Sequence, residues 1–176
     1  ILLVSVFARA QSHEFQVEVI DNTLNAPWAV VTAPGGEIFV TDKVGEIYIY
    51  RNDKRVMKLK GLPSSIAVVG QGGLLDLAFH PNFEDNGYIY LSYSTRQNAN
   101  PSNGYNTRVS RFVLKGDQLT SEKILVQGGF GTDGAHFGCR LTFDKDGKLF
   151  ATFGERHHKE KAQELQYYLV MFMSLH

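Results

Sequence analysis

The chain has 176 residues, of which 43% are hydrophobic, and its 18 Lys and Arg residues balance its 18 Asp and Glu residues. The length is sufficient for one domain with its own core, and the balanced, scattered charge excludes an electrostatic case for nucleic acid or an acidic membrane surface as partner. The single cysteine, Cys139, excludes an intramolecular disulfide and any metal site built on two cysteines.

The chain begins with an uncharged apolar run, residues 1–7, which is followed by Ala8-Arg9-Ala10 and then by polar residues. A run of this kind that ends in Ala-x-Ala is typical of a secretory signal peptide. We therefore expect residues 1–10 to be the remnant of a signal peptide and the protein to be periplasmic or secreted. The alternative is a first buried strand. The run is too short to span a bilayer, so no membrane insertion is expected.

One pattern then occurs three times. Each copy has an apolar, β-rich segment, a turn, and a second apolar segment that opens with Gly and ends in a hydroxyl residue. The second segments are Gly36–Thr41, Gly87–Ser92 and Gly147–Thr152, and the first segments are residues 28–32, 74–79 and 140–143. Residues 45–50 and 109–114 are typical of further strands, and Gly116-Asp117 of a hairpin turn.

The repeat spacing indicates the fold class. A unit of about 50 residues made of short strands is typical of one blade of a β-propeller with loop insertions. The sequence therefore predicts an all-β, partial β-propeller domain over residues 11–166. A propeller closes with about four to eight blades, so about three units form an incomplete ring with open sheet edges. Helical periodicity is absent until about residue 160.

The last residues depart from this pattern. Residues 160–166 are polar, whereas residues 167–175 are dense in apolar side chains without alternation. This segment is typical neither of a blade strand nor of a linker. We therefore expect an atypical C-terminal tail, residues 167–176, that arises from truncation or from a change of reading frame. A terminal helix that packs its apolar side is the alternative.

Three blocks carry a family resemblance: residues 24–47, residues 70–83 and residues 136–156. In this order they resemble the soluble pyrroloquinoline-quinone-dependent glucose and aldose sugar dehydrogenases, the glucose/sorbosone dehydrogenase family. The resemblance covers about residues 15–166, and its most specific part is the G-Q-G-G-L-L-x-L-A-F-H-P-x-F block. It implies a six-bladed propeller that holds the quinone, PQQ, at the axial end of the ring.

The resemblance also implies the chemistry. A histidine takes the proton from the anomeric hydroxyl of an aldose sugar while hydride passes to PQQ, and an external acceptor reoxidises the quinone. The matching residue is His136, and an imidazole suits the task because its pKa lies near neutrality. Calcium ligands and cationic contacts to the quinone come from later blades of the family, and this sequence has none of those segments. We therefore expect the chain by itself to be impaired.

Two more residues match positions near the cofactor. Gln71 corresponds to the family's glutamine beside sugar and quinone. An amide suits a polyhydroxyl substrate because it both donates and accepts hydrogen bonds. The alternative is that the Gln71 side chain ties down its own loop. The glycines at 70, 72 and 73 would let the backbone approach a flat ligand. Arg140 is a candidate for orienting the base or for binding a cofactor carboxylate, with a structural ion pair as the alternative. Some family members have an acidic residue where this chain has Ala135, which removes one contact.

Other reactive residues have simpler interpretations. We expect His80 to pack within a blade, and Asp42 and Asp76 to serve turns or pairing. Cys139 and His136 could be drawn as a nucleophile and its base, but a small buried side chain explains the cysteine more simply.

His157 and His158 lie near Glu155, yet the spacing fits no standard zinc motif, so a solvated loop and no metal site are expected.

Two other functions remain open. A non-catalytic propeller module that binds a carbohydrate or a protein would use the same fold. A propeller hydrolase that acts on sugar lactones needs carboxylate and Asn ligands near the axis, and no convincing set of them stands out in the sequence. The sequence does not indicate the preferred sugar or the oligomeric state.

Overall fold

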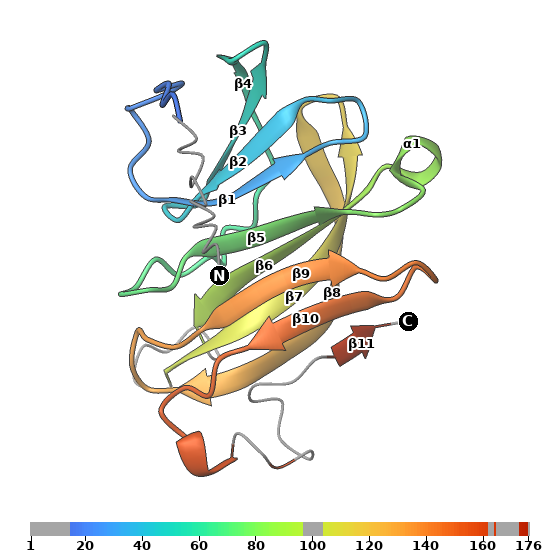
Figure 1. The fold of residues 1–176 in the computed structure, drawn as a ribbon. Coiled ribbons are helices and arrows are strands. Elements are labelled where there is room, and N and C mark those ends of the chain that lie inside the picture. Colours follow the sequence, from blue (N-terminus) through green and yellow to red (C-terminus); the bar gives the residue numbers. More distant parts are fainter. Residues whose placement is uncertain (1–14, 97–103, 162–163, 165–172, 176) are drawn as a thin grey trace, which may run out of the picture.

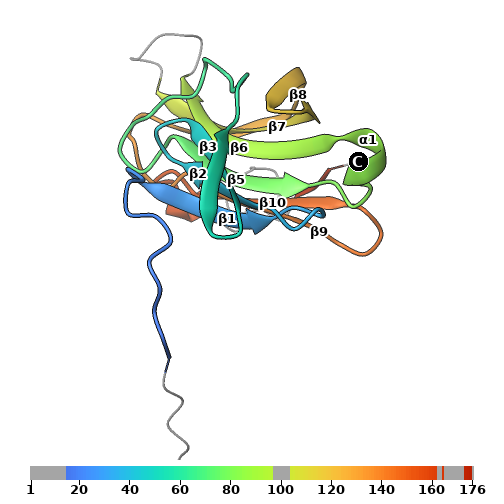
Figure 2. The ribbon, with the colours of Figure 1, turned by 90° about the horizontal axis from the view of Figure 1, so that it is seen from above.

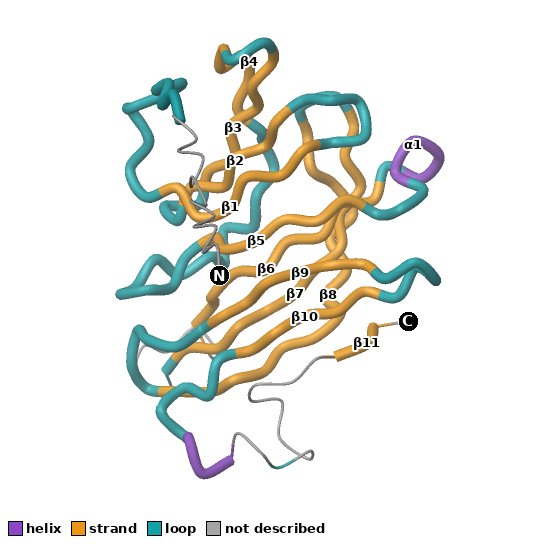
Figure 3. The backbone as a smooth tube through the Cα atoms, viewed as in Figure 1, coloured by secondary structure: helices purple, strands orange, loops and turns teal. Residues whose placement is uncertain are grey.

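The structure is a computed structural model of the chain that describes residues 15–96, 104–161, 164 and 173–175. Within these ranges nearly all regular structure is β-strand (Figure 3). The strands form three antiparallel sheets with the orders β1-β2-β3-β4, β5-β6-β7-β8 and β11-β10-β9. The first sheet has β1 (Pro27–Thr32), β2 (Ile38–Asp42), β3 (Glu46–Arg51) and β4 (Lys54–Lys58), the second has β5 (Leu74–Phe79), β6 (Tyr88–Arg96), β7 (Tyr105–Lys115) and β8 (Gln118–Gly131), and the third has β9 (Gly138–Phe143), β10 (Leu149–Phe153) and β11 (Met173–Leu175).

The sheets follow one another as propeller blades do. The first strand of the middle sheet, β5, contacts β1 on one side and β9 on the other (Figure 1). All three inner strands begin at the same edge of the molecule, on the left in Figure 1. From this inner strand each sheet proceeds outward in chain order, which is the topology of a blade. The prediction of an incomplete β-propeller with three blades is confirmed.

Two apolar layers fill the spaces between neighbouring blades. β5 supplies Leu74 and Leu77 to one layer and Leu75 and Ala78 to the other, so both of its faces are buried. This explains its almost continuous apolar sequence, since a strand that is covered on both faces needs no polar alternation. Partners of the first layer include Phe39, Ile47, Ile49, Leu91, Tyr93 and Phe112, and those of the second include Val109, Phe137, Cys139, Leu141, Ala151 and Phe153.

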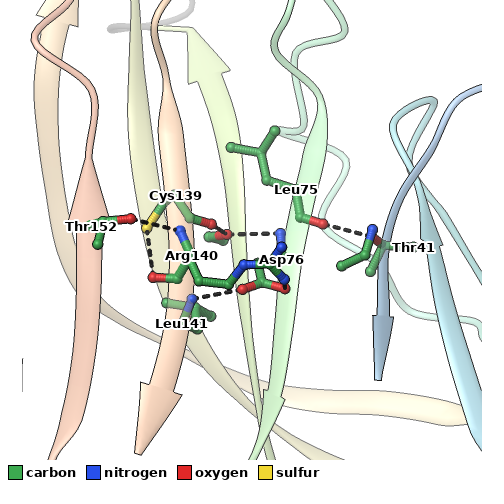
Figure 4. A network of polar contacts seen from close by, with 9 residues as sticks. Thr41, Leu75, Asp76, Cys139, Arg140, Leu141 and Thr152 are labelled. Carbon is green, nitrogen blue, oxygen red and sulfur yellow. Dashed lines mark hydrogen bonds and ion pairs between the residues drawn. The ribbon is translucent and has the colours of Figure 1, made fainter. Parts of the chain in front are cut away.

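The hydroxyl residue that ends the first and the second repeat links one blade to the next. The Thr41 hydroxyl accepts a hydrogen bond from the Ala29 backbone N–H at 3.0 Å and donates to the Leu75 carbonyl of the next blade at 2.6 Å (Figure 4). Thr41 is fully buried. A hydroxyl residue is favoured at this point because a hydroxyl both donates and accepts, and both backbone groups would otherwise be left without this partner.

The second copy repeats this arrangement in full, and the third repeats the hydrogen bond within the blade. Ser92 accepts from the Asp76 N–H at 2.9 Å and donates to the Cys139 carbonyl of the third blade at 3.0 Å. Thr152 accepts from the Arg140 N–H at 2.9 Å (Figure 4). The hydroxyl at the end of the first and the second repeat is therefore a bridge between neighbouring inner strands.

Turns and short helices join the strands. Gly36 and Gly147, both with positive φ, close the turns before β2 and β10 with hydrogen bonds to the carbonyls of Ala33 and Asp144. The corresponding turn in the second blade contains the short helix α1 (Phe83–Asn86), and a 3-10 turn, η3 (Lys159–Lys161), follows β10. Gly116, also with positive φ, lies in the predicted hairpin turn between β7 and β8.

The tail differs from the sequence expectation at three residues. Met173–Leu175 form β11, which pairs antiparallel with β10, so the prediction that this segment is unlike a blade strand is wrong there. Pairing requires backbone groups and not side-chain alternation, which is why the pattern missed it. The other residues of the tail, 167–172 and 176, and the predicted signal remnant, residues 1–10, lie outside the described residues.

The first described residues, from residue 15 on, extend away from the sheets (Figure 2), whereas Asp21, Asn25 and Ala26 hydrogen-bond to Tyr50 and Asp42 of the first sheet before β1 begins. No helix in the described part of the chain is long and apolar enough to cross a bilayer.

Candidate functional site

Two loops that precede inner strands meet at one edge of the molecule. One lies before β5 and contains Gln71, and the other lies before β9 and contains His136. The Gln71 backbone N–H donates to the Gly134 carbonyl at 2.7 Å. The His136 backbone N–H in turn donates to the side-chain oxygen of Gln71 at 2.9 Å. Gln71 therefore joins the second blade to the third and fixes the backbone of His136, while its amide NH₂ group has no part in these two bonds.

Two of the glycines around Gln71 have a structural role in the loop. A Cβ on Gly70, which has φ +51°, would lie 2.4 Å from the Gly134 carbonyl oxygen, and one on Gly73 would lie 2.1 Å from the Lys43 carbonyl oxygen. These positions are filled by protein atoms, so close packing of the loop accounts for both glycines, and the approach of a flat ligand to this backbone stays a prediction. The glycines are needed because the loop packs against neighbouring backbone.

His136 forms a pair with Glu155. The imidazole Nδ1 contacts a carboxylate oxygen of Glu155, and 42% of the histidine side chain is exposed. The hydrogen bond from His136 holds the pKa of the Glu155 carboxyl below its ordinary value, so the carboxylate is an acceptor. Nδ1 is then the donor in this contact, and in the neutral imidazole the lone pair is on Nε2. His136 has φ +54°, an uncommon conformation for a residue other than glycine and one that occurs often at functional sites.

The hairpin of β9 and β10 explains this pair. Phe153 lies opposite Gly138 after a register shift in the ladder. The same register, continued past both strand ends, brings His136 opposite Glu155. The sequence predicted the hairpin, but the bulge moves the partners by one residue, so the sequence alone could not identify the carboxylate that pairs with the histidine.

A second imidazole lies on the first one. The His157 ring stacks on the His136 ring with centroids 4.1 Å apart, and its Nε2 lies 3.0 Å from Asp133 Oδ2. His157 lies in an exposed turn, as the sequence predicted, but its ring also belongs to the cluster around His136. His158 fits that expectation, since it is exposed and its Nδ1 lies 3.5 Å from a Glu160 carboxylate oxygen.

The buried side chain of Arg156 packs beneath the exposed cluster of His136, His157 and Glu155 and contacts Phe137 and Asp133. Its guanidinium is buried, lies 3.8 Å from the centroid of the Phe137 ring, and donates to the Asp133 carbonyl at 2.7 Å. Burial lowers the pKa of Arg156, but a guanidinium stays charged at neutral pH. Sequence reasoning missed Arg156, because an arginine between a glutamate and two histidines gives no signal that it is buried. Its contacts hold the loops at residues 133 and 155–157 together.

Arg140 pairs with a buried carboxylate. Its Nη1 lies 3.1 Å from Asp76 Oδ1, while the Leu141 N–H donates to the other oxygen of Asp76 at 2.7 Å (Figure 4). Burial raises the pKa of Asp76, against the lowering effect of these two partners. The structural ion pair that the sequence left open is thus present, although 64% of the Arg140 side chain stays exposed.

Three further residues have the structural roles that were predicted. Cys139 is buried and burial raises the pKa of its thiol to about 12, which excludes a thiolate nucleophile. Asp42 accepts the backbone N–H groups of Asn25 and Ala26 at 2.8 and 3.1 Å. His80 packs its ring against aromatic side chains of the second and third blades, namely Tyr88, Tyr90 and Phe143.

Comparison with known proteins identifies relatives. Residues 24–173 match the family described as Glucose / Sorbosone dehydrogenase. Aldose sugar dehydrogenase YliI of Escherichia coli (strain K12) is 34% identical over 154 residues, which are 85% of this chain and 40% of that protein. Quinoprotein glucose dehydrogenase B of Acinetobacter calcoaceticus is 29% identical over 164 residues, which are 90% of this chain and 34% of that protein.

A solved structure named glucose dehydrogenase has a TM-score of 0.80 and 25% identity, and the match covers 89% of this chain and 49% of that one. The chain thus spans between about a third and a half of the length of these relatives. The family match, in contrast, covers most of the chain, and it includes both site loops and every strand from β1 to β10. On this evidence the chain belongs to the glucose/sorbosone dehydrogenase family.

Proposed function

We propose that the chain is part of a PQQ-dependent dehydrogenase that oxidises aldose sugars at the anomeric hydroxyl to lactones, with His136 as the general base. The observation that carries this proposal is the pair of His136 and Glu155 at the exposed edge where the inner strands begin. A base must reach its substrate and must keep a lone pair available at neutral pH. His136 can reach a substrate because its side chain is 42% exposed, and the carboxylate at Nδ1 leaves Nε2 as the nitrogen that can accept the proton in the neutral ring.

The proton follows a defined path. Nε2 of His136 accepts the proton of the anomeric hydroxyl, and the imidazolium that forms is stabilised by the Glu155 carboxylate at Nδ1. Gln71 acts as a positioning residue through the His136 N–H, and its amide NH₂ group can donate to a sugar hydroxyl. Bound beside these residues, PQQ would supply the acceptor for the hydride of the anomeric carbon.

The described residues fit one side of such a cofactor. The imidazole of His136 and the amide of Gln71 suit the side on which the sugar reacts. The cations nearby are already engaged: Lys43 Nζ donates to the Gly70 carbonyl at 2.7 Å, and Arg140 pairs with Asp76. We therefore propose that groups outside this chain's three blades bind the carboxylates of PQQ and hold Ca²⁺, and that the isolated chain is impaired.

The remaining parts of the proposal concern context. We place the enzyme in the periplasm or outside the cell, with an external electron acceptor, on the basis of the apolar N-terminal run and of the family. These assignments are independent of the choice of base.

The test uses dye reduction. The chain alone, and the chain joined to the remaining blades of the E. coli relative, are each incubated with PQQ, Ca²⁺ and glucose. We expect reduction of an artificial dye by the joined protein and a loss of about 10²–10⁴-fold in kcat for His136→Ala. His158→Ala is the matched control and should stay active. An undiminished His136→Ala variant would refute the base assignment, and a joined protein that gives no absorbance change on titration with PQQ would favour a non-catalytic binding module.

A further inference from the structure

The cluster around His136 contains more donor groups than a general base needs. His136, His157 and Glu155 each offer one ligand atom, and these atoms all lie within 4.8 Å of one another. They come from the loop before β9 and from the segment after β10, so the hairpin itself holds them together. Two imidazole nitrogens and one carboxylate oxygen form a donor set that suits zinc and its neighbours in the first transition row.

The carboxylate of Asp133 adds an outer partner for this donor set. Asp133 Oδ2 lies 3.0 Å from His157 Nε2, which leaves Nδ1 of that ring as the possible ligand atom. Histidines that bind metal ions usually donate their second ring N–H to a carboxylate, which fixes the ring and raises its basicity. Asp133 is itself held in place, because its carbonyl accepts a hydrogen bond from the buried guanidinium of Arg156 at 2.7 Å.

Only small movements separate this arrangement from a coordination shell. Bond lengths of 2.0–2.2 Å in a tetrahedral site place ligand atoms roughly 3.4 Å apart. The ligand atoms lie within 4.8 Å of one another, so the most distant pair needs to close by about 1.4 Å at most, whereas His136 Nδ1 and the Glu155 carboxylate oxygen, which are already in contact, need to separate. All three side chains are partly exposed, at 42%, 22% and 50% for His136, Glu155 and His157, and so have room to turn. Three protein ligands would leave the fourth position of a tetrahedral ion open to water.

We propose that His136, His157 and Glu155 form a binding site for a divalent transition-metal ion such as Zn²⁺, and that occupation of this site inactivates the base. A ring nitrogen can hold either a metal ion or a proton in its lone pair. When the metal takes Nδ1 of His136, neutral imidazole carries its hydrogen on Nε2, so the nitrogen that faces solvent can no longer accept a proton. When the metal takes Nε2, the lone pair is used directly. The inhibitory part rests on the proposed function, whereas the binding does not.

The donor set also predicts selectivity. Calcium and magnesium prefer sites made of oxygen ligands, and this site offers one carboxylate beside two imidazoles. The site is therefore distinct from the calcium site that the family resemblance implies. Millimolar Ca²⁺ should not compete with Zn²⁺ here.

Binding is measured on the metal-free chain without quinone or sugar, by calorimetric titration with ZnCl₂ and by the visible absorption of bound Co²⁺. We expect one ion per chain with a Co²⁺ spectrum of four-coordinate type. His157→Ala should abolish this binding, Asp133→Asn should weaken it by about 10–100-fold, and His158→Ala is the matched control that should bind as the parent does. Circular dichroism of each variant establishes that the sheets are intact.

Three results would overturn the proposal: no stoichiometric Zn²⁺ binding to the parent chain, equal binding by the parent and His157→Ala, or loss of binding in His158→Ala alone. The dehydrogenase proposal is tested separately, because it depends on dye reduction in the joined protein with all transition metals removed. Zn²⁺ binding by the chain without dye reduction by the joined protein would refute the proposed function and support the metal site. Dye reduction by the joined protein without Zn²⁺ binding by the chain would refute the metal site and support the proposed function.

Discussion

At the scale of single residues, the family resemblance identified the two site residues that the structure joins by a hydrogen bond, but not their other partners. It indicated His136 and Gln71, because they stand in sequence blocks. It could not indicate Glu155, Asp133 or His157 as partners, because their contacts depend on a register shift in the β9–β10 hairpin and on positive φ angles at His136 and His157. Neither the register shift nor a positive φ angle can be recognised in the sequence when the residues concerned are not glycine.

Replacement of Glu155 by Gln tests the tautomer that the structure implies. The amide is neutral and holds the imidazolium poorly, so kcat of the joined protein should fall by about 10²–10⁴-fold. The ¹⁵N chemical shifts of the His136 ring in the chain itself should also change, because the Nδ1–H tautomer is no longer favoured by a carboxylate. Glu160→Gln, at an exposed carboxylate near His158, serves as the control. Unchanged ring shifts in Glu155→Gln would contradict this assignment.

Cys139 allows a second test at this scale. Its pKa of about 12, caused mainly by burial, means that the thiol is protonated throughout the physiological range. We expect no reaction with iodoacetamide at pH 8 in the folded chain and complete alkylation in 6 M guanidinium chloride, measured by mass spectrometry. Rapid alkylation of the folded chain at pH 8 would show that the inner strand β9 is not packed as described.

At the scale of elements, strands that alternate or are wholly apolar were predicted from the sequence, and β4 was not. All five residues of β4 are exposed, and three of them are Lys or Arg. Charged side chains are typical of an edge strand, where they oppose pairing with other chains, and they remove the hydrophobic pattern on which sequence prediction depends. The hydroxyl at the end of each repeat was visible in the sequence, but its function as a bridge required the spatial neighbours.

Removal of the bridging hydroxyls should therefore be costly. Thr41→Val and Ser92→Ala each leave a buried backbone N–H and a carbonyl of the next blade without their partner. We expect each to lower the free energy of unfolding by about 1–3 kcal/mol. Thr152→Val removes the one hydrogen bond described for Thr152 and should cost less, because this residue is only partly buried.

Urea unfolding followed by circular dichroism measures the three variants of this series. Equal losses at all three positions would show that the contact to the next blade contributes nothing. A larger loss for Thr152→Val than for Ser92→Ala would contradict the bridge as the source of stability.

At the scale of the whole molecule, the three blades are not equivalent. The middle blade is covered on both faces by apolar layers, whereas each outer blade has one such layer among the described residues. The order of the blades could be predicted from the repeat, but the two layers could not, because alternate residues of β5 serve different layers and the register of β5 shifts between Leu74 and Leu77.

Hydrogen exchange should report this difference. Amides of β5 and β6 should exchange slowest, and those of β1 and β4 should exchange faster, because local opening costs least where few apolar contacts are broken. Exchange followed by mass spectrometry of peptic fragments resolves these strands. If β4 were as protected as β6, the chain would unfold as one cooperative unit and the layered description of its stability would be wrong.

The bridges between blades also have a direction. In each complete bridge the hydroxyl belongs to the earlier blade and the carbonyl to the later one. The stack of blades therefore has two different ends. The hydroxyl of Thr152 lies at the end that would donate to a further blade, and the backbone of β1 lies at the end that would accept from one. A directional module of this kind can be extended only head to tail. For protein engineering, the middle blade, residues 74–131, is thus a unit whose duplication would keep every bridge in register, whereas its inversion would place hydroxyl against hydroxyl.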